Sequence, residues 1–169
     1  IWSAGCSSGE EVYTMAMVMH EFMSESKKKF NYQILGTDLS SRILKKAVNA
    51  VYNEDRVVNI PLEIKRKYFL KSKDRSNPTV RVIKELRSKT YYQRLNFMDH
   101  SYDSVKEMFD IVFCRNVLIY FNRPTQEQVI SRLCRNLKHG GHFFLGHSES
   151  IMGMKLPLRQ IKPTILQNI

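Results

Sequence analysis

Helical and strand-like hydrophobic patterns alternate along this chain. Apolar residues recur at helical spacing over residues 9–23, which predicts a helix that packs on a sheet. Residues 32–38 form a short apolar run that ends at Asp38, and a second helical stripe begins after Ser40, whose hydroxyl suits an N-cap. The first part of the chain therefore predicts a helix, a strand and another helix.

The clearest strand pattern lies at residues 109–114, whose nearly continuous apolar centre is typical of a sheet covered on both faces. Residues 125–137 then predict a helix with Thr125 in a capping box. The glycine pair at 140–141 is expected to end that helix before a strand at 142–146. Strands alternating with helices predict a doubly wound α/β fold, in which right-handed crossovers join parallel strands.

Residues 52–95 have a less regular pattern. Pro61 suits the first turn of a short helix. The segments 79–83 and 91–95 have strand character and could pair as antiparallel strands of a small inserted β element. The second segment could instead belong to the main sheet, because it leads into Asn96 as a strand leads into a binding loop.

Composition indicates one globular domain, because 169 residues with 43% hydrophobic side chains suffice for a buried core. The longest apolar runs are far shorter than the roughly 18 residues of a membrane-spanning helix, so we expect a soluble protein without membrane insertion. The chain begins without Met at what resembles the tail of a strand, so we expect a fragment with a truncated first strand. A net charge of +11 favours an acidic partner, either protein or nucleic acid.

Cysteine and histidine spacing argues against a metal site. The three cysteines are widely spaced and form no C-x-x-C pattern, so we expect neither a disulfide scaffold nor a zinc site. His139 and His142 flank the glycine pair, where a turn is expected instead of a ligand-bearing helix face. We therefore expect no bound metal.

Ligands of doubly wound sheets bind beyond the carboxyl ends of the strands, which directs attention to five loops. The first loop, residues 3–9, contains small residues that let a ligand approach the backbone, although it lacks G-x-G-x-x-G. The loops begin at Ser3, Asp38, Asn96, Arg115 and Gly146.

Glu10 and Glu11 follow the first loop directly. The helix dipole accounts for one of these carboxylates, and a ligand with an ammonium or sulfonium group would account for the other. Two anions would repel a pyrophosphate, so the loop favours a cationic nucleoside over a dinucleotide. Asp38 is placed to accept hydrogen bonds from ribose hydroxyls, with an N-cap role as the alternative.

The segment after the strand at 109–114 also carries chemistry. Arg115 requires a carboxylate partner if it is buried, and Asn116 can hold a ligand through both its donor and its acceptor. Tyr120 is either a core aromatic residue or a hydroxyl in the segment that overhangs the ligand.

Several of these strings, in order and spacing, resemble the chemotaxis receptor glutamate methyltransferase (CheR) family. The resemblance implies a Rossmann-like class I methyltransferase fold, S-adenosylmethionine as cofactor and S-adenosylhomocysteine as product. The strings are Ser3-Ala4…Gly9-Glu10-Glu11-Val12-Tyr13, Gly36-Thr37-Asp38-Leu39-Ser40, Phe109 to Cys114 with Arg115-Asn116-Val117-Leu118-Ile119-Tyr120-Phe121, and Gly146-His147-Ser148-Glu149.

The same resemblance assigns roles to the candidate residues. Glu11 and Asp38 would hold the methionyl and ribose portions of the cofactor, and Asn96 and Phe97 would flank the adenine. Tyr120 would face the transferring methyl group as the catalytic residue. The remaining candidate cofactor-binding residues are Ser3 and Ala4 in the first loop and the pocket-completing pair Arg115 and Asn116.

The implied reaction is O-methylation of glutamate side chains on the cytoplasmic domain of a methyl-accepting chemotaxis receptor. A glutamate pKa of about 4.3 means that the nucleophile is already an anion at neutral pH, so the enzyme needs mainly to position it. The family's small β subdomain, which docks on a receptor tail peptide in some members, would lie within about residues 68–95. Its N-terminal helical domain and an Arg-bearing motif lie outside this sequence, so cofactor binding is what we expect of the fragment itself.

Two alternatives are a nucleic-acid methyltransferase and a non-catalytic module that binds the cofactor and a receptor. The charge of +11 favours the first, but residues 115–118 are not the Asn/Asp-Pro-Pro-aromatic string that amino-directed members usually show, so we expect no stable nucleic-acid complex. The cofactor and the free cysteines indicate a cytoplasmic location.

Overall fold

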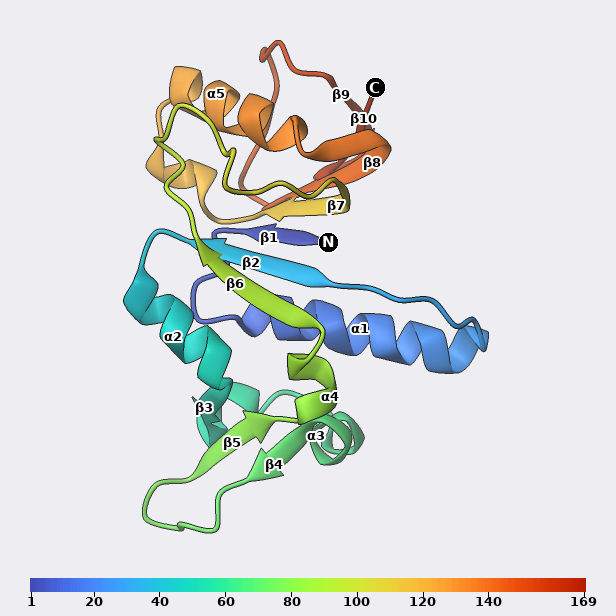
Figure 1. Cartoon of the computed structure of the whole chain (residues 1–169), viewed down its shortest axis with the longest axis vertical. Coiled ribbons are helices and arrows are strands. Elements are labelled where there is room, and N and C mark those ends of the chain that lie inside the picture. The colour runs from blue at the N-terminus through green and yellow to red at the C-terminus, as the bar shows by residue number, and fades with distance from the viewer. The chain divides into compact units, whose positions relative to one another are not determined.

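The computed structural model describes residues 1–169 and contains one seven-stranded and one three-stranded sheet (Figure 1). The strands of the larger sheet are hydrogen-bonded in the order β6-β2-β1-β7-β8-β10-β9. They are β1 (Trp2–Ala4), β2 (Ile34–Asp38), β6 (Thr90–Arg94), β7 (Phe109–Cys114), β8 (Leu137–Leu145), β9 (Leu158–Lys162) and β10 (Ile165–Asn168). The α-helices are α1 (Glu10–Ser26), α2 (Ser41–Asn49), α3 (Leu62–Tyr68), α4 (Lys84–Arg87) and α5 (Arg123–Cys134). The α/β class predicted from the patterns is confirmed.

The chain divides into two compact units. Unit 1 comprises residues 1–5, 37–39 and 95–169, and unit 2 comprises residues 6–36 and 40–94. Strand β2 contributes residues to both. No helix combines the length and the hydropathy that a bilayer crossing requires.

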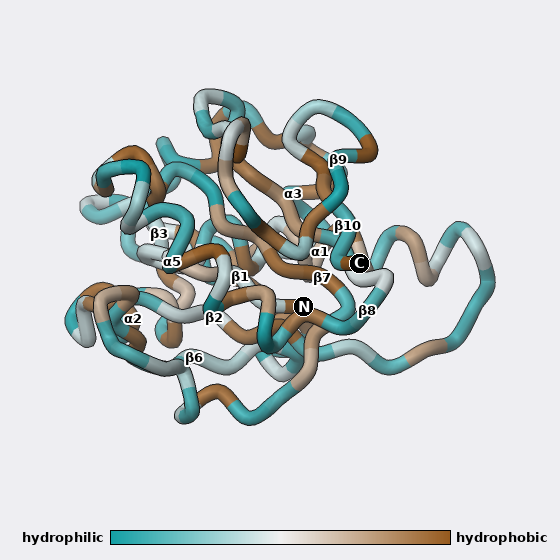
Figure 2. Tube along the Cα trace, turned by 90° about the horizontal axis from the view of Figure 1, so that it is seen from above, coloured by the Kyte–Doolittle hydropathy of each residue, from teal (hydrophilic) through white to brown (hydrophobic).

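The core of unit 1 is built on β1, β7 and β8, which run parallel to one another. Trp2 is fully buried between Tyr102 and Phe109, and its indole Nε1 donates a hydrogen bond to the Thr37 hydroxyl at 2.9 Å. Figure 2 shows hydrophobic stretches of the chain at β1 and β7. The near-continuous apolar run of β7 follows from its place inside a covered sheet.

The end of unit 1 departs from the all-parallel expectation. Strand β10 pairs antiparallel with both β8 and β9, so the larger sheet is mixed. Neither β9 nor β10 was predicted. In β9 only Leu158 is buried, and in β10 only Leu166 is, so neither strand carries a strong hydrophobic alternation.

Helix α5 and strand β8 begin at other residues than the sequence predicted. Asn122 is the N-cap of α5, and its side chain accepts a hydrogen bond from Thr125 N at 3.1 Å, so the capping box at Thr125 was wrong. The helix ends at Cys134, and the glycine pair lies inside β8. The register of β7 with β8 shifts at this point, where Gly140 has φ +75. The pair therefore belongs to a bulge and does not stop a helix.

In unit 2, α1 and α2 pack against β6. The Tyr13 hydroxyl donates to Ala47 O at 2.8 Å, which joins the two helices. A Cβ at Gly36 would lie 2.7 Å from Tyr92 Cδ1, so the aromatic ring of β6 requires glycine at this position of β2. The predicted N-cap at Ser40 is confirmed, because its side chain accepts from Ile43 N.

The small sheet in unit 2 is antiparallel and has the order β3-β5-β4. Its strands are β3 (Val51–Asn53), β4 (Phe69–Lys71) and β5 (Thr79–Val82). The segment 91–95 does not pair with it, because β6 belongs to the larger sheet. The predicted antiparallel pairing of 79–83 with 91–95 was therefore wrong. The alternative, that 91–95 belongs to the main sheet, was right. The small sheet begins before residue 68, because β3 is part of it. Pro61 precedes α3 as expected.

Candidate cofactor site

The first loop leaves β1 at two buried residues. Ser3 and Ala4 are 0% and 1% exposed, so both residues are buried at the end of β1. Gly5 has φ +84, and its N–H donates to Thr37 O at 2.8 Å. A Cβ at Gly5 would lie 2.3 Å from Val117 Cγ2, so glycine lets the loops after β1 and β7 approach each other.

Asp38 ends β2 and is half-buried. Its carbonyl oxygen accepts a hydrogen bond from Leu95 N at 3.0 Å, which brings the start of the loop at Asn96 beside the end of β2. Because Ser40 caps α2, the N-cap interpretation of Asp38 was wrong. The position of Asp38 at a strand end agrees with its predicted role toward ribose hydroxyls.

The loop at Asn96 and Phe97 is fixed by its own polar groups. The Asn96 side chain accepts from Met98 N at 3.0 Å and donates to the Asp99 carboxylate at 3.2 Å, so both ends of this amide serve the turn. The carbonyl of Phe97 accepts from the Tyr102 hydroxyl at 2.9 Å and from Arg132 Nη1 at 3.1 Å. The half-buried Phe97 ring is thus held in place as an apolar face.

Burial is the largest influence on the hydroxyl that anchors this loop. It raises the pKa of Tyr102 to about 12, against an opposing contribution from the Arg132 guanidinium. The phenol is therefore neutral at physiological pH and remains a donor to the Phe97 carbonyl. The Tyr102 hydroxyl therefore does not titrate near neutral pH.

The segment after β7 turns sharply and then exposes a tyrosine. Arg115 is half-buried, and Asn116 is exposed with φ +59, a left-handed conformation. A 3₁₀ helix, η2 (Leu118–Tyr120), follows. The Tyr120 side chain is 79% exposed, so its interpretation as a core aromatic residue was wrong and its hydroxyl is accessible.

Glu149 was named only as part of a motif and given no role, yet it organises this segment. The residue is 9% exposed, and its carboxylate accepts from three backbone amides, those of Val117, Leu118 and Gly146. The signal in the sequence was an acidic residue shortly after a predicted strand. Its partners, at 31 and 32 residues' separation, were not predictable from spacing.

The two carboxylates at the start of α1 have different surroundings in unit 2. Both oxygens of exposed Glu10 accept from the Ser8 hydroxyl, at 2.9 and 2.7 Å, so Glu10 belongs to the helix start. Glu11 is half-buried and keeps its place as the candidate for a cationic ligand. Glu11 lies in unit 2, and all other predicted site residues lie in unit 1.

The residues of unit 1 suit S-adenosylmethionine. The carboxylate of Asp38 can accept two ribose hydroxyls, and the held ring of Phe97 offers a face for a base. This set of groups matches a nucleoside without phosphates.

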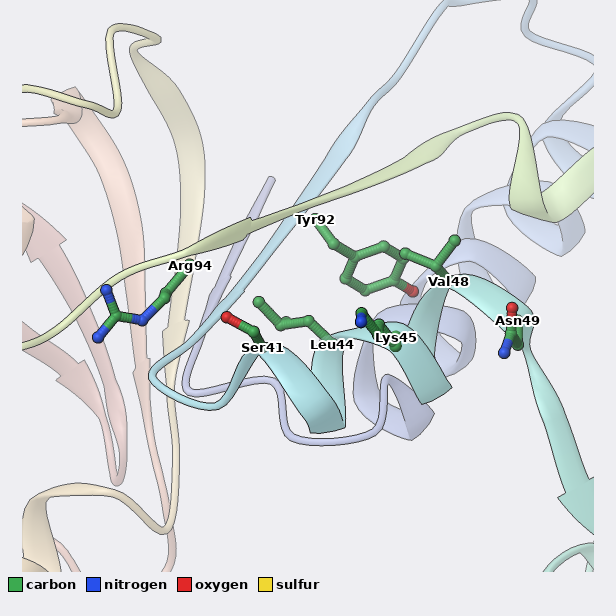
Figure 3. Close-up of a pocket in the computed structure, with 7 residues that line it drawn as sticks. All are labelled: Ser41, Leu44, Lys45, Val48, Asn49, Tyr92 and Arg94. Carbon is green, nitrogen blue, oxygen red and sulfur yellow. The ribbon is translucent and has the colours of Figure 1, made fainter.

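A pocket in unit 2 involves none of these residues. Figure 3 shows it between α2 and β6, with Leu44 and Val48 on the helix and Tyr92 on the strand. Lys45 and Arg94 also line it. None of the predicted cofactor-binding residues lines this groove.

Residues 1–166 match the family described as CheR methyltransferase, SAM binding domain. The chain is 40% identical over 155 residues to the chemotaxis protein methyltransferase of Borreliella burgdorferi, covering 92% of this chain and 53% of that protein. It is 32% identical over 165 residues to chemotaxis protein methyltransferase 2 of Pseudomonas aeruginosa, covering 98% and 58%. The chain thus spans little more than half the length of these relatives. The match confirms the predicted resemblance and the predicted cofactor, S-adenosylmethionine, and the chain belongs to the CheR methyltransferase family.

Proposed function

We propose that the full-length protein transfers a methyl group from S-adenosylmethionine to glutamate side chains on the cytoplasmic domain of chemotaxis receptors. The products are glutamate methyl esters and S-adenosylhomocysteine. The observation that carries this proposal is the exposed hydroxyl of Tyr120 on a fixed loop at the carboxyl end of β7. Two relatives named as chemotaxis protein methyltransferases support it.

In this proposal the strand-end residues hold and orient the cofactor, whose sulfonium supplies the methyl group. Asp38 would accept hydrogen bonds from the ribose hydroxyls, and Phe97 would hold the adenine, with Asn96 shaping its loop. The other groups, completing the pocket, are the peptides of Ser3 and Ala4 and the side chains of Arg115 and Asn116.

The substrate needs no general base. A glutamate with a pKa of about 4.3 is an anion at neutral pH, so its carboxylate would take the methyl group without prior loss of a proton, and S-adenosylhomocysteine would be the leaving group. The Tyr120 hydroxyl donates a hydrogen bond to that carboxylate and sets its direction of approach. Alignment of this kind is worth several kcal/mol, about 7 in good cases.

The charge of the chain suits an acidic protein surface. A net charge of +11 favours the approach of a receptor segment that carries several glutamates. Within the same proposal, the small sheet β3-β5-β4 is the part that docks on a receptor tail. The charge and the small sheet both favour association with the receptor, whereas the strand-end loops carry out the methyl transfer.

The test is transfer of labelled methyl groups by the full-length protein to a purified receptor cytoplasmic domain. We expect base-labile methanol from the receptor, and none from a receptor whose glutamates are replaced by glutamine. Tyr120→Phe should lower the rate about tenfold, the loss that one hydrogen bond to a charged group implies. Label appearing in RNA or DNA instead would favour a nucleic-acid methyltransferase. Binding of S-adenosylhomocysteine without any transfer would favour a non-catalytic module.

A further inference from the structure

A single buried carboxylate joins the loops that follow β7 and β8. Glu149 Oε1 accepts from Val117 N at 3.0 Å and from Leu118 N at 2.9 Å, and Oε2 accepts from Gly146 N at 2.7 Å. Val117 and Leu118 immediately follow the turn after β7, and Gly146 immediately follows β8. One side chain therefore satisfies donors from both strand ends.

The short helix η2 depends on this carboxylate for its cap. Its N-cap residue, Val117, has no side-chain acceptor, so the first amides of the helix need a partner from elsewhere. Glu149 supplies it from 31 and 32 residues away along the chain. Hydrogen bonds to an ionised acceptor are about twice as strong as those between neutral groups, which suits a carboxylate here.

Crowding around Glu149 shows that the arrangement is closely packed. A Cβ at Gly146 would lie 2.7 Å from Glu149 Oε2 and 3.0 Å from Asn116 N. Asn116 itself has φ +59, a conformation that persists only where its surroundings hold it. Two of the amides that Glu149 binds, those of Val117 and Leu118, lie directly after this residue, so Glu149 stabilises the left-handed turn.

The far end of the same segment is held independently. The Gln126 side chain on α5 donates to Leu118 O and Phe121 O, both at 2.9 Å. Residues 117–121 are thus fixed at their start by Glu149 and at their end by Gln126. The exposed Tyr120 side chain stands between these two anchors.

We infer that Glu149 is a positioning residue for methyl transfer, which fixes the backbone that carries Tyr120. The inference rests on the proposed function and deepens it. Glu149 acts through the amides of Val117 and Leu118, and its buried carboxylate acts neither as a base nor as a cofactor ligand. Its effect should appear in turnover much more than in cofactor binding.

The test compares steady-state kinetics of the full-length protein and its Glu149→Gln and Glu149→Ala variants. Glutamine keeps the shape but turns an N–H donor toward one of the three amides, so we expect kcat to fall about tenfold. Alanine removes all three acceptors, and we expect a fall of about tenfold here too, because the loss cannot exceed that of the Tyr120 hydroxyl itself. The KM for S-adenosylmethionine should change less than about threefold. Glu107→Gln, an exposed glutamate of unit 1, is the matched control and should keep both values.

A double variant separates positioning from general destabilisation. If Glu149 acts through Tyr120, Glu149→Gln combined with Tyr120→Phe should be no slower than Tyr120→Phe alone. Independent, multiplied losses would overturn the inference, as would an unchanged kcat in Glu149→Gln. Glutamine also covers the case in which alanine does not fold.

A readout without turnover distinguishes this inference from the proposed function. In amide NMR spectra of the full-length protein, Glu149→Gln should shift the Val117, Leu118 and Gly146 resonances, while Glu107→Gln leaves them in place. Unshifted resonances would overturn the inference even in an active enzyme. Absence of receptor labelling by the wild type would instead overturn the proposed function, whatever the resonances show.

Discussion

The central strands of the larger sheet bury more of their residues than the strands of the small sheet do. All three residues of β1 are buried, and β2 is buried from Ile34 to Thr37. In the small sheet, β3 and β4 have no buried residue, and β5 buries only Val80 and Val82. Strands covered on both faces give the loops at their ends a rigid base, which a sheet with one buried face provides less well.

The two sheets also differ in which of them carries the predicted site residues and which exposes apolar side chains. The predicted site residues of unit 1 lie at the ends of β1 and β2 and in the segments that follow β6 and β7. The small sheet instead exposes apolar side chains, with Leu70 at 59% and Val51 at 44%. A substitution in the larger sheet should therefore threaten the fold, and one in the small sheet should not.

The largest expected effect comes from removing a buried side chain from the larger sheet. Phe143→Ala removes a fully buried ring from β8 and should lower the free energy of unfolding by about 3–5 kcal/mol. Leu70→Ala in β4 should change it by no more than about 0.5 kcal/mol. Urea titrations followed by circular dichroism measure both values. Similar losses for the two variants would remove the contrast between the sheets.

An intermediate effect is expected where α3 meets α1 in unit 2. The buried Tyr68 hydroxyl hydrogen-bonds to His20 Nδ1 at 2.8 Å and to the Glu21 carboxylate. Tyr68→Phe keeps the ring and removes these bonds, so stability should fall by about 1–2 kcal/mol. Tyr68→Leu, which also changes the ring packing, should cost more in the same urea titration. A neutral Tyr68→Phe would show that α3 is held by packing alone.

The smallest effect is a pH dependence at the same place. The Lys67 ammonium and the Tyr68 hydroxyl donate hydrogen bonds to Glu21 and hold the pKa of its carboxyl below the ordinary value of 4.5. A depressed folded-state pKa stabilises the protein above the unfolded value, and that stabilisation disappears as pH falls through the folded value. The stability difference between wild type and Glu21→Gln should therefore shrink between about pH 6 and about pH 3. A difference that stays constant over this range would contradict the assignment.

The sequence predicted best where burial is strongest. The strand at 109–114 was predicted with the bounds that β7 has, because two covered faces require a continuous apolar run. Ser40 was recognised as an N-cap because its hydroxyl serves an amide three residues away, at Ile43. Strand β3 escaped prediction, because three residues with no buried side chain carry no period.

The errors arise where two local patterns compete or where contacts with distant parts of the chain determine the structure. Thr125 has the form of a capping residue, but Asn122 takes that position, and both fit the same local pattern. The glycine pair at 140–141 has the composition of a helix stop, yet pairing with β7 makes it a bulge in β8. Glu149 acts on amides far along the chain, which no local spacing reveals. The strand-end loops were located correctly, whereas the contacts that hold them required the structure.

The central claim is that the strand-end loops of unit 1 bind the cofactor, and a calorimetric titration with S-adenosylhomocysteine tests it most directly. The full-length protein should bind, and Asp38→Ala should weaken the affinity by about tenfold to a hundredfold, as loss of hydrogen bonds to a charged group implies. Asp103→Ala removes an exposed carboxylate of the same unit and should leave the affinity unchanged. Equal affinities for wild type and Asp38→Ala would contradict the account.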